Sequence, residues 1–163
     1  MSYEIVGESV KSAISIKLGQ IFPDITRYKE AITTLKYPHF FIYQISMETI
    51  AQEKNRYILS YLMNIRYRYV DDVDTVNDLN QHLDNVALKL LSELDTISFT
   101  DEDGITRPVE IQNPRYEKQD GVLYYFCNIN IRVKRPTVKD IEMNDLKLNE
   151  EVKWYGRYIY KSK

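Results

Sequence analysis

Two long segments of the chain alternate between apolar and polar side chains. Residues 121–135 do so after an Asp-Gly turn, and residues 56–70 do so after a polar turn. The apolar positions are Tyr57, Leu59, Tyr61, Met63, Ile65, Tyr67 and Tyr69 in one segment and Leu123, Tyr125, Cys127, Ile129, Ile131 and Val133 in the other. A period of two predicts long strands that each bury one face.

Further strands are predicted on both sides of these segments. Residues 40–51 also alternate, and the polar turn at residues 52–55 joins them to residues 56–70, which predicts a long antiparallel hairpin. A second hairpin is predicted from residues 96–100 and 105–112, around an acidic turn that contains Gly104. We expect short extended pieces at residues 24–30, as an edge strand or a plain connection, and at residues 116–118.

Two segments have the apolar spacing of helices. Residues 4–22 form the first, which Pro23 ends, and residues 75–94 form the second. We expect Asp74 or Thr75 to cap the second helix, with acidic residues in its first turn. The order of elements predicts an α+β fold, with a mainly antiparallel sheet, two amphipathic helices packed on one face and a long β-hairpin.

The length of the chain predicts a single domain over residues 1–163, with an α+β core at 1–136 and a C-terminal extension at 137–163 that includes a candidate interface strand. Fifteen strand residues at 56–70 would span about 50 Å, whereas a globule of this size has a diameter of about 40 Å. The hairpin must therefore bend at a bulge, or its tip must project. The polar tip residues are our candidates for an assembly contact: Glu48, Gln52, Glu53, Lys54, Asn55 and Arg56.

The net charge is −2, but the charges are unevenly distributed. Residues 71–103 contain ten acidic side chains and one basic side chain, Lys89. Such a segment suits head-to-tail contact between copies, and a solvated acidic helix face explains it equally. The acidic interface candidates are Asp71, Asp72, Asp101 and Asp103. The chain also has fourteen tyrosines, a residue type that favours both interfaces and strands.

Four basic side chains occupy the polar positions of the two longest predicted strands. They are Arg66, Arg68, Arg132 and Lys134, and they share one sheet face if the strands are neighbours in a suitable register. We find no clear aromatic stacking pattern beside them. These four positions are compatible with a solvated sheet face whose charges protect the sheet edge from pairing with other strands. They are also compatible with a surface that binds nucleic acid or an acidic partner.

Residues that would supply catalytic chemistry are scarce. His39 and His82 have no metal-binding spacing, Cys127 lies on an apolar strand face, and no phosphate-binding glycine motif or nucleophile elbow occurs. A cation site around Asp71 and Asp72 would lack the glycine and distal glutamate of a calcium loop. We expect no enzyme activity, cofactor or metal. Without a membrane-length apolar run or a signal-peptide core, we expect a soluble protein of intracellular origin.

The succession of these segments resembles the tail terminator, or tail completion, proteins of tailed phages, especially those of contractile-tailed prophages and phage-like bacteriocins of Gram-positive bacteria. The resemblance covers residues 9–153. It is carried by the segments GQIFPD, PHFFIYQI, NRYILSYLMNIRYRY, NDLNQHLDNVALKLLSEL, DGVLYYFCNINIRVKR and IEMNDLKLNEEVK. Residues 152–163 extend beyond the family pattern and include two further interface candidates, Trp154 and Tyr155.

This resemblance implies a virion protein at the head-proximal end of the tail, assembled in the bacterial cytoplasm. Its implied form is a hexameric ring that caps the tail tube, ends tube and sheath growth and presents a surface for joining the head. The implied partners are further copies, the tail tube protein, the sheath and a head-completion protein, with transient passage of DNA and no membrane. The alternatives are another neck or head-closure protein and, from a different class, a single-stranded nucleic-acid-binding module.

Overall fold

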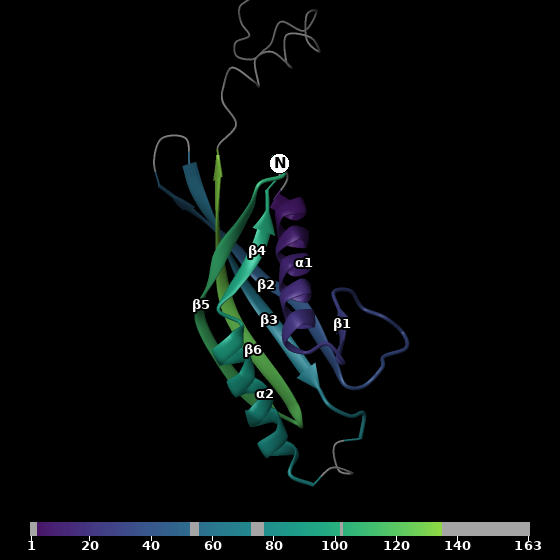
Figure 1. Cartoon of the computed structure of the whole chain (residues 1–163). Helices are drawn as coiled ribbons and strands as arrows, with labels where there is room; N and C mark the ends of the chain where they lie inside the picture. Colours follow the sequence, from purple (N-terminus) through teal and green to yellow (C-terminus); the bar gives the residue numbers. More distant parts are fainter. Residues whose placement is uncertain (1–2, 53–55, 73–76, 102, 135–163) are drawn as a thin grey trace, which may run out of the picture. The chain divides into compact units, whose positions relative to one another are not determined.

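The computed structural model describes residues 3–52, 56–72, 77–101 and 103–134 (Figure 1). The chain divides into two compact units, one of Met1–Ile50 with Leu59–Ile131 and one of Ala51–Ile58 with Arg132–Lys163. The elements are α1 (Tyr3–Ile21), β1 (Thr26–Tyr28), β2 (His39–Ala51), β3 (Arg56–Arg68), α2 (Leu79–Glu93), β4 (Thr96–Thr100), β5 (Thr106–Gln119) and β6 (Val122–Lys134). The predicted extension at residues 137–163 lies outside the described residues, so its boundary stays a prediction.

The strands form one sheet in the order β1-β2-β3-β6-β5-β4. The two longest predicted strands, β3 and β6, are therefore neighbours, and they run in opposite directions (Figure 1). β1 pairs in parallel with only His39, Phe40 and Phe41 of β2. β5 pairs with β4 along its first part and with β6 along its second part, both antiparallel. The predicted α+β fold with a mainly antiparallel sheet is confirmed.

The core lies on the sheet face that the two alternating patterns predict. The buried strand positions are Leu59, Tyr61, Met63, Ile65 and Tyr67 of β3 and Leu123, Tyr125, Cys127, Ile129 and Ile131 of β6. The helices contribute Val6, Val10, Ala13, Ile14, Leu18 and Ile21 from α1 and Leu83, Val86, Ala87 and Leu90 from α2. At about 1.5–3 kcal/mol for each large apolar side chain, this layer is the main stabilising contribution to the fold.

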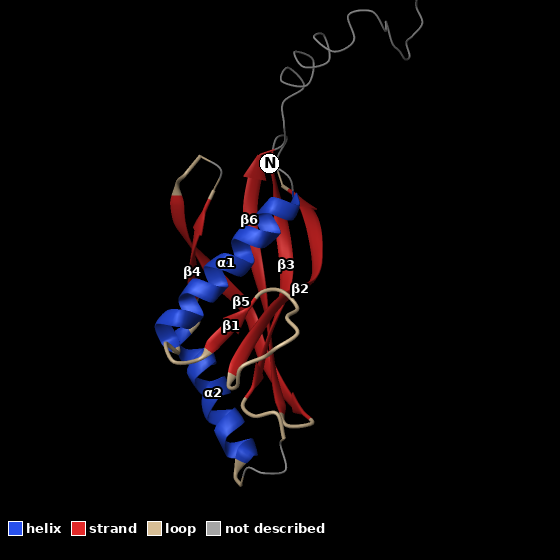
Figure 2. Ribbon diagram, turned by 90° about the vertical axis from the view of Figure 1, so that its right-hand side faces the viewer, coloured by secondary structure: helices blue, strands red, loops and turns tan. Residues whose placement is uncertain are grey.

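Helix α1 contacts both edge strands, β1 and β4, although these strands stand at opposite ends of the sheet order. The sheet must therefore curl around the helix, which lies across it in Figure 2. Gly19 allows the close approach to β1, because a Cβ at this position would lie 2.9 Å from the guanidinium carbon of Arg27. Lys29 beyond β1 also donates a hydrogen bond to Ser12 of α1 at 2.9 Å.

Some predicted boundaries are wrong. Helix α2 begins at Leu79, four residues after the predicted start, and Asp78 precedes it with φ 58° and no side-chain capping bond. The predicted cap residues Asp74 and Thr75 lie outside the described residues. Its first turn contains no acidic residue. Aspartate tolerates the left-handed backbone region, so Asp78 forms a turn where we expected helix. Residues 106–112 and 116–118 belong to one strand, β5, because the register shift between Gln112 and Arg115 interrupts the pairing with β6 without ending the strand.

The buried thiol of Cys127 and the half-buried imidazole of His82 have ordinary structural surroundings. Cys127 is free and buried, and burial raises the pKa of its thiol to about 12, so the thiol is uncharged at neutral pH. The Nε2 atom of His82 lies 2.9 Å from the Tyr67 hydroxyl, and the Tyr69 ring packs 4.2 Å from the imidazole. Burial lowers the pKa of His82 and raises that of Tyr67, so both groups are neutral.

Candidate functional site

The sheet face opposite the core carries an arginine clamped between two tyrosines. The guanidinium of Arg66 on β3 lies 5.4 Å from the ring centroid of Tyr43 on β2 and 5.4 Å from that of Tyr124 on β6. An Nη2–H of Arg66 also donates a hydrogen bond to the Tyr43 hydroxyl at 3.2 Å. Each stacked pair contributes about 0.5–1 kcal/mol at a partly exposed site. The three strands are thereby joined across this face.

The same arrangement recurs one strand further along. Arg115 of β5 stands opposite Phe126 of β6 in the strand register, and its guanidinium lies 5.0 Å from the Phe126 ring. We call Tyr43, Arg66, Tyr124, Phe126 and Arg115 the arginine–aromatic face. Our expectation that no clear aromatic stacking pattern accompanies the basic residues is wrong at Arg66 and at Arg68, which lies over the Tyr37 ring. Tyr124 and Phe126 occupy polar-register positions of β6, which was a local signal for this face.

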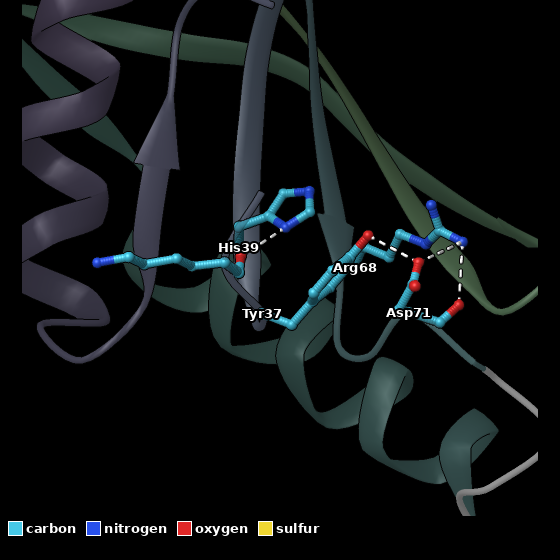
Figure 3. A network of polar contacts seen from close by, with 5 residues as sticks. Tyr37, His39, Arg68 and Asp71 are labelled. Carbon is cyan, nitrogen blue, oxygen red and sulfur yellow. Dashed lines mark hydrogen bonds and ion pairs between the residues drawn. The ribbon is translucent and has the colours of Figure 1, made fainter. Parts of the chain in front are cut away.

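Arg68 belongs to a polar network at one end of β3 (Figure 3). Its Nη2 lies 3.2 Å from the backbone oxygen of Asp71 and 4.0 Å from the Asp71 carboxylate. The Tyr37 hydroxyl donates to the same carboxylate at 3.0 Å, and the Arg68 guanidinium lies 5.8 Å from the Tyr37 ring. Asp71 therefore connects the loop after β3 to the loop before β2. Because its side chain is well exposed, this ion pair contributes little to stability.

Burial and hydrogen bonding shift two pKa values in this network. Burial, and secondarily the hydrogen bond to Asp71, raises the pKa of Tyr37. Burial lowers the pKa of His39, against the opposing effect of the Lys36 carbonyl, which lies 2.9 Å from Nδ1. The positive charges of Arg68 and Arg66 lower it further. A neutral imidazole therefore packs against Tyr37 of this network, with ring centroids 5.0 Å apart.

Lysines from other parts of the chain pair with acidic residues of segment 71–103, so its local negative charge is smaller than the sequence alone indicates. Its Asp84 pairs with Lys118 at 2.7 Å, and its Asp95 lies 3.6 Å from Lys17. These lysines come from β5 and α1, outside the segment. The remaining acidic interface candidates Asp71, Asp72 and Asp103 are exposed.

Asp101, another interface candidate, has a structural role in the β4–β5 turn. Its carboxylate accepts hydrogen bonds from the backbone N–H groups of Asp103 at 3.1 Å and Ile105 at 2.9 Å. It also pairs with Arg107 at 2.9 Å. These bonds give Asp101 a structural role in the turn, and its assignment to an interface stays a prediction.

The hairpin candidates are exposed wherever the structure describes them. Glu48 and Gln52 on the β2 side are exposed, as is Arg56 at the start of β3. Glu53, Lys54 and Asn55 lie outside the described residues, as do Trp154 and Tyr155. The assignment of these residues to an interface stays a prediction.

The four basic candidates are divided between the two compact units, and their grouping on one face stays a prediction. Arg66 and Arg68 belong to the first compact unit, whereas Arg132 and Lys134 belong to the second and are exposed. The sheet order meets the first condition for a shared face, since β3 and β6 are neighbours.

A groove of about 560 Å³ runs between α1 and β4. Its lining is mainly apolar and comes from Glu8, Ser9, Ser12, Ala13, Ile16, Ser98 and Thr100. Glu8 is the one acid or base in this lining, and it pairs with Lys11. Within the described ranges, no three side chains of the metal-binding types converge, and no helix has the length and apolarity needed to cross a membrane.

These features define a structural α+β protein whose candidate sites are surfaces for contact with other macromolecules. A family model described as "Phage tail terminator protein" matches residues 9–141. The chain therefore belongs to the phage tail terminator family, has a structural role in the phage tail and is a component of the virion. A search among curated proteins finds no match to the chain.

Proposed function

We propose that this protein is the terminator of a phage tail, which forms a hexameric ring on the last ring of tube subunits. The ring ends polymerisation of the tube, and of a sheath in a contractile tail, and provides the surface that joins the head. The family match over residues 9–141 is the observation that carries this proposal. The partners are other copies, the tail tube protein, the sheath and a head-completion protein.

Surface chemistry supports ring formation. A closed ring needs two different patches on each copy, and each contact should bury more than about 1,000 Å² to be specific. The exposed acidic residues Asp71 and Asp72 follow β3, and exposed Asp103 lies in the β4–β5 turn at the other end of the sheet (Figure 1), so they offer two separate acidic candidates. Glu48 and Arg56 are further exposed candidates from the hairpin. Gln52 to Asn55, Asp101, Trp154 and Tyr155 complete the proposed interface on sequence grounds.

The basic residues suit the inner surface of such a ring. Arg66, Arg68, Arg132 and Lys134 would line the channel and allow DNA to pass without sequence-specific binding. Arg66 is held by two tyrosine rings, so its charge is fixed in place and not free to wrap around a phosphate.

The experiment mixes the purified protein with tail tubes assembled from the cognate tube protein. We expect rings of about six copies at one end of each tube in negative-stain images, and tubes that stop elongating when more tube subunits are added. A matched variant replaces residues 48–56 with a two-residue turn and is checked for folding by circular dichroism. Tubes that elongate equally with and without the wild-type protein would contradict the proposal.

Two alternatives have their own readouts. A head-closure protein would bind DNA-filled heads and leave tube growth unchanged. The arginine–aromatic face is the observation that favours a single-stranded nucleic-acid-binding module, because such modules combine cations with rings. That module would bind a fluorescent oligonucleotide in a strongly salt-dependent way, and Arg66→Ala would weaken the binding.

A further inference from the structure

Within the described residues, the sheet ends in two free edges. One is β4, which pairs with β5 alone. The other is the greater part of β2, because β1 pairs with only His39–Phe41. Residues 42–50 of β2 therefore have β3 on one side and no described strand on the other. Nine residues at about 3.3 Å each give an edge of about 30 Å with unpaired N–H and C=O groups.

The free edge of β2 lacks the features by which proteins protect an edge strand. Residues 42–50 contain no proline and one charged residue, Glu48. Ile45 and Ile50 are both 47% exposed. Long edges with exposed apolar side chains pair readily with other strands unless charge, proline or a bulge prevents it. This stretch has the composition of an edge that accepts a partner.

The edge at β4 has an apolar groove beside it. Ser98 and Thr100 of β4 form one wall, and Ala13 and Ile16 of α1 are part of the other. Ile16 is 64% exposed and is thus an apolar side chain on the outer face of α1. The groove of about 560 Å³ offers room for the apolar side chains of an added strand.

We propose that β2 of one copy adds to the β4 edge of the next copy, so that the sheet continues from copy to copy around the assembly. This inference rests on the ring given as the proposed function. A head-to-tail ring needs two different and complementary patches, and the two opposite edges of one sheet are such a pair. The five residues of β4 fit within the nine free residues of β2, and main-chain hydrogen bonds would supply the contact.

The test is disulfide formation between two different single-cysteine variants, Ile45→Cys and Ser98→Cys, mixed in equal amounts. Ser98 is exposed between buried Ile97 and Phe99, so its side chain lies on the outer face. Ile45 shares its strand face with Tyr43, which belongs to the arginine–aromatic face. Directly opposed residues have Cβ atoms about 4.5–5.5 Å apart, within reach of a disulfide after a small adjustment. Buried Cys127 does not compete.

We expect the yield of the mixed disulfide between Ile45→Cys and Ser98→Cys to be at least tenfold above that of a control mixture. In the control, Leu88→Cys replaces Ile45→Cys. Leu88 lies on α2 and is 58% exposed, so it matches the apolar character and exposure of the edge site. Cysteine variants at Tyr43 and Met47 test the registers in which β2 is shifted by two residues in either direction. A mixed yield no greater than the control in every register would overturn the proposal. So would Ile45→Cys homodimers without mixed dimers, because they indicate contact between two β2 edges.

Light scattering on the same samples separates this inference from the proposed function. Assembled particles without the mixed disulfide would overturn the edge contact and leave the ring in place. A protein that stays monomeric at all concentrations and on tube ends would overturn the ring as well. As a second variant, Ile45→Lys should weaken assembly at least tenfold, whereas Leu88→Lys should leave it unchanged; equal effects of the two would overturn the edge contact.

Discussion

Strands β2 and β3 are hairpin partners of thirteen residues each, yet they have different surroundings. β3 is buried at every core position from Leu59 to Tyr67, whereas β2 is buried only at His39, Phe40 and Ile42. β3 has a strand on both sides, and β2 loses its neighbour β1 after Phe41. Equal alternation in the sequence therefore predicts two strands, but the position in the sheet decides which one stabilises the fold and which one is available for assembly.

The largest expected effect comes from a matched pair of isoleucines on these two strands. Ile65→Ala on β3 removes a fully buried side chain and should lower the free energy of unfolding by about 2–5 kcal/mol. Ile45→Ala on β2 removes a side chain that is 47% exposed and should change it by about 0.5 kcal/mol or less. Urea denaturation measures both. Similar losses for the two variants would contradict the comparison.

Asn64 of β3 is a polar side chain that is completely buried, and its replacement is the next test. Neither its Nδ2 nor its Oδ1 has a hydrogen-bond partner in the part of the chain that is described. Replacing a buried amide without partners by an apolar group of similar size removes a desolvation penalty of about 1–3 kcal/mol. We expect Asn64→Leu to raise the urea midpoint, and Asn128→Leu, at a half-buried site on β6, to leave it nearly unchanged. A lower midpoint for Asn64→Leu would mean that the amide is bonded.

The histidines next to these strands make stability depend on pH. Burial lowers the pKa of His39, at the start of β2, and of His82, beside Tyr67 of β3, below the ordinary value of 6.5. The unfolded chain then binds protons before the folded one, so the free energy of unfolding falls as the pH drops through 6.5. The decrease ends once the pH is below the folded pKa values. Denaturation curves at pH 7.5, 6.5 and 5.5 should show this decrease, and the His39→Gln, His82→Gln double variant should flatten it.

The smallest expected effect concerns the arginine–aromatic face, which joins β2 to β3 and β6. Arg66→Lys keeps the charge but loses the planar stacking on Tyr43 and Tyr124, so the free energy of unfolding should fall by about 0.5–1 kcal/mol. Arg132→Lys, at an exposed position of β6, is the control and should have no measurable effect. Equal stability of both variants would show that the stacking contributes nothing.

The sequence predicted the parts of the fold that depend on local periodicity. The alternation of β3 and β6 and the stripe of α1 were sufficient because each buries one continuous face. The start of α2 was missed because Asp78 adopts a left-handed turn, and β5 was divided because its alternation is interrupted between Gln112 and Arg115, where the register shifts and Asn113 has a positive φ. Neither conformation has an unambiguous local signal.

The candidate site was less predictable because it depends on the order of the strands. The clamp around Arg66 combines Tyr43 and Tyr124, which become neighbours only when β2, β3 and β6 are adjacent. The free edge of β2 depends in the same way on the shortness of β1. Likewise, Lys118, which is distant in the sequence, compensates the charge of one acidic residue of the segment 71–103, Asp84.

Hydrogen–deuterium exchange tests most directly whether the free half of β2 is the assembly edge. Peptides that cover residues 42–50 and 57–68 are followed in the dilute protein and in the protein assembled on tube ends. We predict that residues 57–68 are protected in both states, whereas residues 42–50 exchange faster in the dilute protein and become protected on assembly. Residues 42–50 that exchange equally fast in both states would contradict the account.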